Sequence, residues 1–181
     1  MDIHANLSTD SLAGRLSQRL KETGAPDDVR ALADALTELA VRDPLTNLFN
    51  RRIFDEALAR SIETAQRLGS ELSLVIFDIN KLKQLNDTQG HIAGDEAIQK
   101  FTAVLRQTAR ETDIICRLGG DEFAVILPDT AKTGAREFVR RFTENLEPVT
   151  SITAGVGIAS LPSENILAAA DQELLKAKTK Q

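Results

Sequence analysis

Residues 117–123 read Arg-Leu-Gly-Gly-Asp-Glu-Phe, and this short stretch decides the fold. Its glycine pair, Gly119 and Gly120, separates two apolar runs at residues 114–116 and 123–127. Adjacent glycines between such runs predict a tight β-hairpin, because the favoured type of two-residue turn needs positive φ at both central positions. We therefore expect two antiparallel strands over residues 113–127, with the glycines at the turn.

Two carboxylates, Asp121 and Glu122, follow the glycines directly. A turn without side chains lets the backbone approach a nucleotide closely. Carboxylate oxygens are the ligands that hard divalent cations prefer. The pattern therefore favours a site for a metal ion and a phosphate group at the hairpin.

Helical and strand patterns alternate on both sides of this hairpin. We expect strands over residues 72–77 and 151–158, and helices over residues 46–68, 92–109, 131–146 and 163–179. This order predicts an α/β (α+β) fold with one central, mostly antiparallel sheet flanked by helices. The polar, glycine-containing stretch 81–95 is by default a solvated loop between helices.

Composition limits the class of protein. The chain has 181 residues and a net charge of −5, which argues against broad binding of a nucleic-acid polymer. The single cysteine, Cys116, excludes an internal disulfide and a cysteine zinc site, and its apolar neighbours predict a buried thiol. No apolar stretch approaches the roughly 20 residues of a membrane span, and no signal peptide opens the chain, so we expect a cytoplasmic protein.

The first forty residues or so predict a short helical extension. We divide the chain into this N-terminal segment, residues 1–42, and a domain over residues 43–181. Within the segment, an a/d stripe about two heptads long is formed by Val29, Leu32, Leu36 and Leu39. A helix packed on its own domain and a dimerising signalling helix explain so short a stripe equally well.

A second acidic position, Asp78, ends the apolar run of the first strand. An unpaired charge there is costly, so the carboxylate needs a partner. Asp78 or Asn80 could cap the next helix. Alternatively, Asp78 could pair with Asp121 across neighbouring strands as a magnesium site, to which the Ile79 carbonyl and Glu122 add oxygen ligands. Magnesium is usually bound through one or two carboxylates and the substrate's phosphates.

The polar stretch 81–95 also carries groups that suit a purine base. A carboxylate such as Asp95 can accept hydrogen bonds from N1–H and N2–H of guanine, which adenine does not offer. The Asn86 amide can bond the remaining edge of the base, and unpaired polar groups would penalise adenine. Lys83 could reach a phosphate.

Together these residues resemble the GGDEF domain of diguanylate cyclases, from Arg42 to about Lys178. Three separated motifs carry the resemblance: the opening Asp-Pro-Leu-Thr-Asn-Leu-Phe-Asn-Arg-Arg at 43–52, the segment 78–95, and the hairpin at 117–123. The resemblance implies a palm-like sheet similar to that of adenylate cyclases and polymerases. It also implies that the domain over 43–181 is a GGDEF domain.

The reaction implied by the resemblance condenses two GTP molecules into cyclic di-GMP and releases two pyrophosphates. Each subunit would bind one GTP, so the active species would be a homodimer. The 3′-hydroxyl of one GTP would attack the α-phosphate of the other. Catalysis would rest on positioning and on stabilisation of charge by a metal ion.

The resemblance assigns roles to individual residues. The metal ligands, for Mg²⁺ or Mn²⁺, would be Asp78, Asp121 and the Ile79 carbonyl. Glu122 would lie beside the metal or the attacking hydroxyl, and Lys83 would act with Asp121 and Glu122 in catalysis. The substrate would be bound by Asn86, Asp95, Lys83, Gly119, Gly120 and Lys178, of which the asparagine and Asp95 read guanine and the lysines contact phosphates.

Arg110 and Asp113 form an Arg-x-x-Asp motif shortly before the hairpin. In the family, this motif at this offset forms the product-inhibition site, in which the guanidinium holds a guanine edge or a phosphate of cyclic di-GMP. The alternative is a surface ion pair at the end of a helix.

The chain also departs from the family. Leu82 replaces a usual phenylalanine, Asn80 a frequent aspartate, and the connection from Leu146 to Ile152 is short. The sequence ends at Gln181, before a usual phosphate-binding arginine, so we expect a weaker hold on the triphosphate. Two other functions therefore stay open: a GGDEF domain that binds cyclic di-GMP with little or no turnover, and an interaction domain dimerised by its N-terminal helix.

Overall fold

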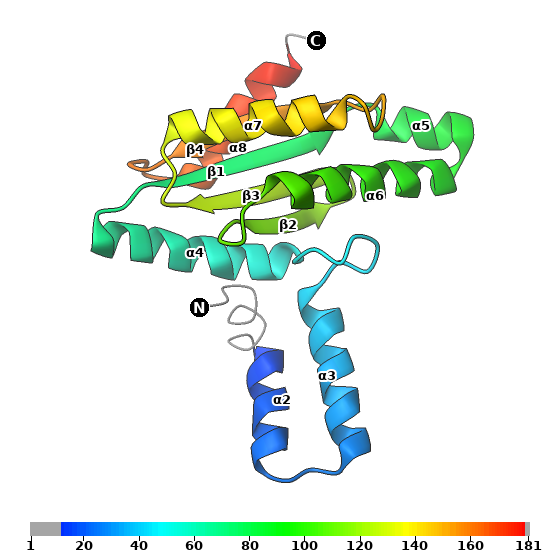
Figure 1. Ribbon diagram of the computed structural model, residues 1–181, viewed down its shortest axis with the longest axis vertical. Helices are drawn as coiled ribbons and strands as arrows, with labels where there is room; N and C mark the ends of the chain where they lie inside the picture. Colours follow the sequence, from blue (N-terminus) through cyan, green and yellow to red (C-terminus); the bar gives the residue numbers. More distant parts are fainter. Residues whose placement is uncertain (1–11, 180–181) are drawn as a thin grey trace.

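The computed structural model describes residues 12–179 as a layered domain and a helical hairpin. Figure 1 shows the sheet between its covering helices. The helical hairpin lies away from the sheet, beyond helix α4 (Arg51–Leu68). Among the described residues, no helix has the length and apolar character needed to cross a membrane.

The sheet has four strands in the order β2-β3-β1-β4. Strand β1 (Leu72–Ile79) pairs antiparallel with β3 (Glu122–Pro128) on one side and with β4 (Ala154–Ser160) on the other. Strand β2 (Ile114–Gly119) pairs antiparallel with the outer side of β3. All eight residues of β1 are buried, which explains its near-continuous apolar run. The expected antiparallel sheet flanked by helices is confirmed.

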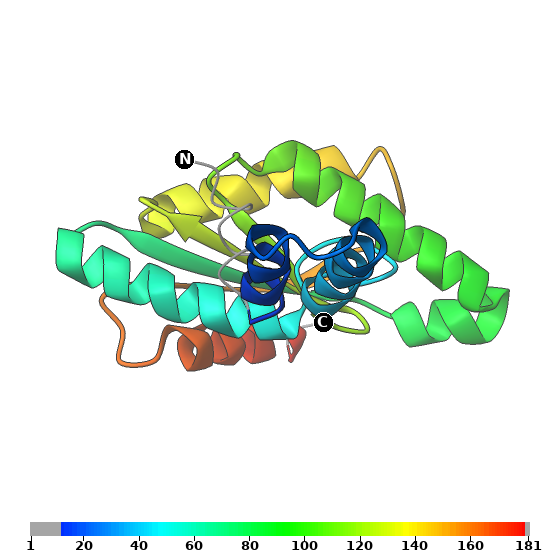
Figure 2. The same ribbon diagram turned by 90° about the horizontal axis from the view of Figure 1, so that it is seen from below.

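Helices cover both faces of this sheet, as Figure 2 shows from below. One face packs against α6 (His91–Thr108) and α7 (Lys132–Leu146). Its centre is a group of phenylalanine rings whose contacting centroids lie 4.9–5.8 Å apart: Phe77, Phe101, Phe123 and Phe142. The other face packs against α4 and α8 (Ile166–Lys178).

The alternation of β1 decides on which face the first acidic side chain lies. Val75 and Phe77 belong to the core under α6 and α7, whereas Leu74 and Ile76 belong to the core under α4 and α8. Because successive side chains of a strand point to opposite faces, Asp78 lies on the α4 and α8 face.

The β-hairpin of β2 and β3 forms as expected, but its turn lies one residue later in the sequence than expected. Gly119 pairs with Glu122, so the two turn residues are Gly120 and Asp121. The register shifts between Arg117 and Gly119, which is the mark of a β-bulge. Neither glycine has a left-handed φ, so the expectation of positive φ at both is wrong.

Several elements also differ from expectation, and the strand expected from residue 151 and the helix expected from residue 163 begin at Ala154 and Ile166. The helix expected from residue 46 begins at Arg51, because Asn50 caps it by accepting a hydrogen bond from the Ile53 N–H at 3.2 Å. The stretch expected to be a loop contains helix α5 (Leu82–Gln89), which ends at Gly90 with φ 87°. A helix of eight residues is too short to show a repeating apolar period, so the sequence pattern missed it.

Helices α2 (Leu12–Glu22) and α3 (Asp27–Val41) form the helical hairpin. The contacts between them are partly polar, because Asp34 accepts a hydrogen bond from Ser17 and pairs with Lys21 at 3.2 Å.

The apolar stripe of α3 does not face α2 or the sheet. The residues Val29, Leu32 and Leu36 are 40%, 61% and 56% exposed. The interpretation of these three residues as a face packed on their own domain is therefore wrong. The Leu39 side chain lies outside the described residues.

Candidate functional site

Three acidic residues are neighbours in the backbone at the edge of the sheet where β1 ends. Asp78 and Glu122 are directly opposite each other on β1 and β3, and opposite residues project to the same face. Asp121 follows in the hairpin turn, and its carbonyl accepts a hydrogen bond from the Ile79 N–H at 3.0 Å. The structure therefore places Asp78, Ile79, Asp121 and Glu122 at one edge of the sheet. We name these four residues the acidic edge.

Asp78 is held by a lysine and not by a helix terminus. Its residue is 8% exposed, and the Lys178 Nζ lies 2.6 Å from its Oδ2. The N-cap of α5 is Lys81, which makes no side-chain capping hydrogen bond. The Asn80 amide donates instead to the Thr153 Oγ1 at 2.9 Å. The interpretation of Asp78 or Asn80 as a helix cap is therefore wrong.

The acidic edge fits an oxygen-ligated cation that is shared with a substrate. Within residues 12–179, no three His, Cys, Asp or Glu side chains are grouped so that they could hold a metal by themselves. Magnesium does not need such a group, because it is usually bound through one or two carboxylates together with substrate phosphates. Asp78, Asp121 and the Ile79 carbonyl are donors of the required kind.

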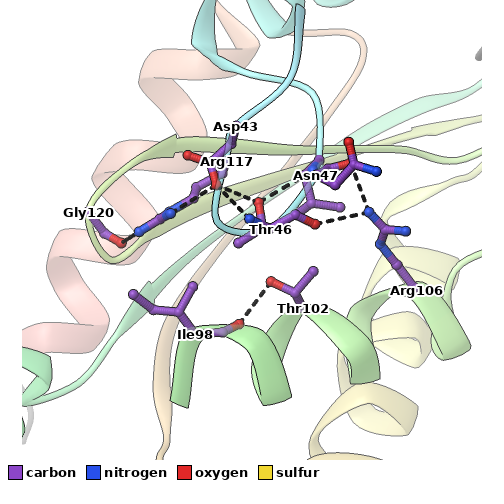
Figure 3. Close-up of polar contacts among 9 residues, drawn as sticks. Asp43, Thr46, Asn47, Ile98, Thr102, Arg106, Arg117 and Gly120 are labelled. Carbon is purple, nitrogen blue, oxygen red and sulfur yellow. Dashed lines mark hydrogen bonds and ion pairs between the residues drawn. The ribbon is translucent and has the colours of Figure 1, made fainter. Parts of the chain in front are cut away.

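Arg117 holds the turn of the β-hairpin in place through two hydrogen bonds. The Arg117 Nη2 donates to the Gly120 carbonyl at 2.7 Å, and its Nη1 donates to the Asp43 Oδ1 at 2.9 Å (Figure 3). Asp43 also accepts from the Thr46 backbone N–H at 2.9 Å and from its hydroxyl at 2.7 Å. The opening motif of the domain therefore supports the turn that carries Asp121. We name these contacts among Asp43, Thr46, Arg117 and Gly120 the brace.

The electrostatics of this brace favour the charged aspartate. Burial alone would raise the pKa of Asp43, but the hydrogen bonds from Thr46 and Arg117 outweigh it and lower the pKa. The brace also reaches α6, because the Arg106 Nη2 donates to the carbonyls of Thr46 and Asn47 at 3.0 and 2.8 Å. Sequence reasoning missed these roles of Asp43 and Arg106.

The residues expected to read guanine lie where α5 meets α6. The Asn86 side chain lies on Gly94, so closely that a Cβ at Gly94 would be 1.9 Å from the Asn86 Oδ1. This oxygen is buried and has no hydrogen-bond partner among the described residues. Asp95 is exposed at the next position of α6. The structure therefore places Asn86 beside Gly94, the residue that precedes Asp95.

The remaining substrate residues approach from two helices. Lys83 is exposed on α5, and Lys178 is the last residue of α8. Lys178 reaches the acidic edge through its ion pair with Asp78. Gly119 lies beside the Glu122 side chain, whose Oε2 would be in ordinary contact, at 3.8 Å, with a Cβ at that glycine.

Arg110 and Asp113 lie apart from the acidic edge, in the turn between α6 and β2. Asp113 is 2% exposed, and its Oδ2 accepts a hydrogen bond from the Arg110 backbone N–H at 2.7 Å. A surface ion pair does not describe so buried a carboxylate. Beside them is a cavity of about 440 Å³, whose lining includes Arg42 and Arg106 as well as Arg110. The Arg42 guanidinium lies 4.0 Å from the centre of the Phe49 ring.

The single cysteine takes no part in either region. Cys116 is fully buried in the core of β2, and burial raises the pKa of its thiol far above the usual range. A thiol that stays protonated is a poor nucleophile and metal ligand. The expectation of a buried cysteine is confirmed.

Comparisons with known sequences agree with this geometry. Residues 40–181 match the sequence family described as "Diguanylate cyclase, GGDEF domain". The response regulator PleD of Caulobacter vibrioides is 32% identical over 95% of this chain and 41% of its own length. The diguanylate cyclase DgcP of Pseudomonas aeruginosa is 33% identical over 92% of this chain and 27% of its own length. The chain therefore spans less than half of either relative.

Among solved structures, the coiled coil and GGDEF domain of DgcB from Caulobacter crescentus, in complex with cyclic di-GMP, superposes with a TM-score of 0.80. The two chains are 27% identical, and the match covers 94% of this chain and 95% of the other.

Proposed function

Since this chain belongs to the GGDEF domain family, we propose that it is a diguanylate cyclase, which condenses two GTP molecules into cyclic di-GMP and releases two pyrophosphates. The observation that carries the proposal is the acidic edge, where Asp78, Asp121 and Glu122 are neighbours in the backbone at the end of β1. The names of its relatives support the same class of enzyme.

In the proposed mechanism, Asp78, Asp121 and the Ile79 carbonyl would hold Mg²⁺ or Mn²⁺. The metal supplies positive charge that stabilises the phosphates in the transition state. Lys83 and Lys178 bind phosphate oxygens, and the backbone at Gly119 and Gly120 lies against the substrate. Glu122, on the same face as Asp78, accepts a hydrogen bond from the attacking 3′-hydroxyl.

Guanine is selected by Asn86 and Asp95. The placement of Asn86 against Gly94, next to the exposed Asp95, supports this role. The carboxylate of Asp95 accepts from two N–H groups of guanine, whereas adenine would leave these protein groups unpaired.

The reaction joins two nucleotides, so two copies of the chain must face each other. We propose that a homodimer forms through the exposed stripe of α3, which presents Val29, Leu32 and Leu36 to solvent. An apolar stripe of this spacing is typical of coiled-coil contacts.

Product inhibition is proposed at Arg110 and Asp113. The neighbouring cavity, lined by three arginines together with Glu111 and Asp113, is suited to cyclic di-GMP, whose two phosphodiesters carry one negative charge each. Replacing Arg110 with alanine should relieve inhibition by added cyclic di-GMP without lowering the initial rate. Product inhibition that is unchanged in this variant would contradict the assignment.

A second candidate function is a receptor that binds cyclic di-GMP and turns over little GTP. The arginine-lined cavity at Arg110 favours it, because this cavity is complete without any residue of the acidic edge. The two functions differ in whether GTP is consumed.

The test is incubation of the protein with GTP and Mg²⁺, and again with Mn²⁺, followed by chromatography of the nucleotides. Asp121→Asn should abolish formation of cyclic di-GMP. Glu71→Gln, at an exposed residue before the opposite end of β1, is the matched control and should retain it. Binding of cyclic di-GMP without any product from GTP would favour the receptor.

A further inference from the structure

Lys178 forms an ion pair with Asp78, one of the metal ligands of the proposed function, and the inference from this pair rests on that function. The Asp78 side chain is 12% exposed and the Lys178 side chain is 41% exposed. A nearly buried carboxylate is therefore held by an ammonium group that has access to solvent. The 2.6 Å distance between the Lys178 Nζ and the Asp78 Oδ2 is that of a short, charge-assisted hydrogen bond.

The packing of α8 on β4 brings the lysine to this position. Gly155 is directly opposite Asp78 on β4. A Cβ at Gly155 would lie 3.5 Å from the Lys178 Cγ and 3.7 Å from its Cε, so the lysine stem crosses the strand at this glycine. At Gly157, a Cβ would lie 2.1 Å from the Ala170 carbonyl oxygen, so α8 rests directly on the backbone of β4. The lysine thus extends from a rigid support.

We propose that Lys178 is an internal cation that competes with a divalent metal ion for Asp78 while no nucleotide is bound. A metal ion that arrives alone must displace the ammonium group from the carboxylate. A metal ion that arrives with a triphosphate gives the ammonium group a new anionic partner. The flexible four-carbon stem and the exposure of Lys178 allow this exchange.

The consequence is positive coupling between metal and nucleotide. The lysine weakens the binding of metal alone and strengthens the binding of metal together with nucleotide. Because coupling between two ligands is reciprocal, the metal raises nucleotide affinity by the same factor. The site therefore avoids holding a metal ion before its substrate is present.

The test measures Mn²⁺ affinity without nucleotide, from the electron paramagnetic resonance signal of free Mn²⁺. Lys178→Gln should bind Mn²⁺ at least about fivefold more tightly than the parent protein, the lower end of usual coupling between ligands. Lys176→Gln is the matched control, because it removes the same charge from an exposed residue of the same helical turn. Equal affinity in the two variants would overturn the proposal.

Two further variants separate this inference from the proposed metal site. Lys178→Arg keeps a cation beside Asp78 and should bind Mn²⁺ as weakly as the parent protein. Tight binding in this variant would overturn the proposal even if Lys178→Gln were unstable. Asp78→Asn should remove Mn²⁺ binding in every background. If Asp78→Asn leaves Mn²⁺ affinity unchanged, Asp78 is not a metal ligand, and the proposed competition between Lys178 and the metal is wrong as well.

Discussion

At the scale of single residues, the contact between Asn86 and Gly94 gives the sharpest prediction. Gly94→Ala places a methyl group 1.9 Å from the Asn86 Oδ1, so the amide must move away from its present position. We expect GTP affinity to fall by about tenfold or more, which corresponds to the loss of roughly one hydrogen bond. Nucleotide titration by calorimetry would measure the loss.

A double-mutant cycle supplies the control for this prediction. In the background of Asn86→Ala, which has no amide to displace, Gly94→Ala should cause little further loss of affinity. Additive losses in the double variant would mean that Gly94 does not act through Asn86. The sequence shows a glycine at position 94. Only the packing of α5 against α6 shows why a larger residue there would collide with Asn86.

At the scale of elements, the brace of Asp43 and Arg117 connects the start of the domain with the hairpin turn. Both side chains are largely buried, at 19% and 11% exposed. Asp43→Asn should lower the free energy of unfolding by about 1–3 kcal/mol, because Arg117 loses a charged partner. Urea denaturation would measure the change, with the exposed Asp171→Asn as a control expected to stay within about 0.5 kcal/mol of the parent protein.

The same brace predicts a pH dependence. The pKa of Asp43 is lowered in the folded protein, so its contribution to stability is complete above the unfolded pKa of about 4. That contribution is lost as the pH falls through the lowered folded pKa. The difference in unfolding free energy between the parent protein and Asp43→Asn should therefore be constant above about pH 5 and shrink below about pH 4. A difference that grows on acidification would contradict this assignment.

The helices and strands differ in how well the sequence predicts them. The apolar run of β1 and the periodic helices 91–108 and 132–146 were predictable, because long segments carry a clear period. Helix α5 was not, because it is short. The brace was not, because Asp43 and Arg117 are 74 residues apart and only the folded sheet joins them.

The candidate site was predictable for a different reason. Two of its residues stand next to a structural signal, which is the end of a buried strand for Asp78 and a glycine turn for Asp121. The position of the turn was less predictable, because the bulge between Arg117 and Gly119 moves it by one residue. The ion pair of Lys178 with Asp78 joins α8 to β1, and the sequence offered no local signal for that contact.

At the scale of the whole molecule, the exposed stripe of α3 predicts the assembly. Leu32→Glu with Leu36→Glu should weaken the proposed homodimer by at least about tenfold, since each buried leucine contributes about 1.5–3 kcal/mol. The rate of cyclic di-GMP formation per chain should then fall most at low protein concentration. Analytical ultracentrifugation would measure the dimer.

Leu68→Glu is the matched control for this assembly. Leu68 is 69% exposed at the end of α4, outside the stripe, so its replacement should leave dimerisation unchanged. If the control and the stripe variants have the same dimer affinity, α3 is not the contact between the two copies.

The central claim is that the acidic edge at the end of β1 converts GTP into cyclic di-GMP. The most direct measurement is the yield of cyclic di-GMP and of pyrophosphate from the same reaction, for the parent protein and for Asp78→Asn. We expect two pyrophosphates for each cyclic di-GMP in the parent protein, and neither product from Asp78→Asn. Pyrophosphate without cyclic di-GMP, or unchanged yields from Asp78→Asn, would contradict this claim.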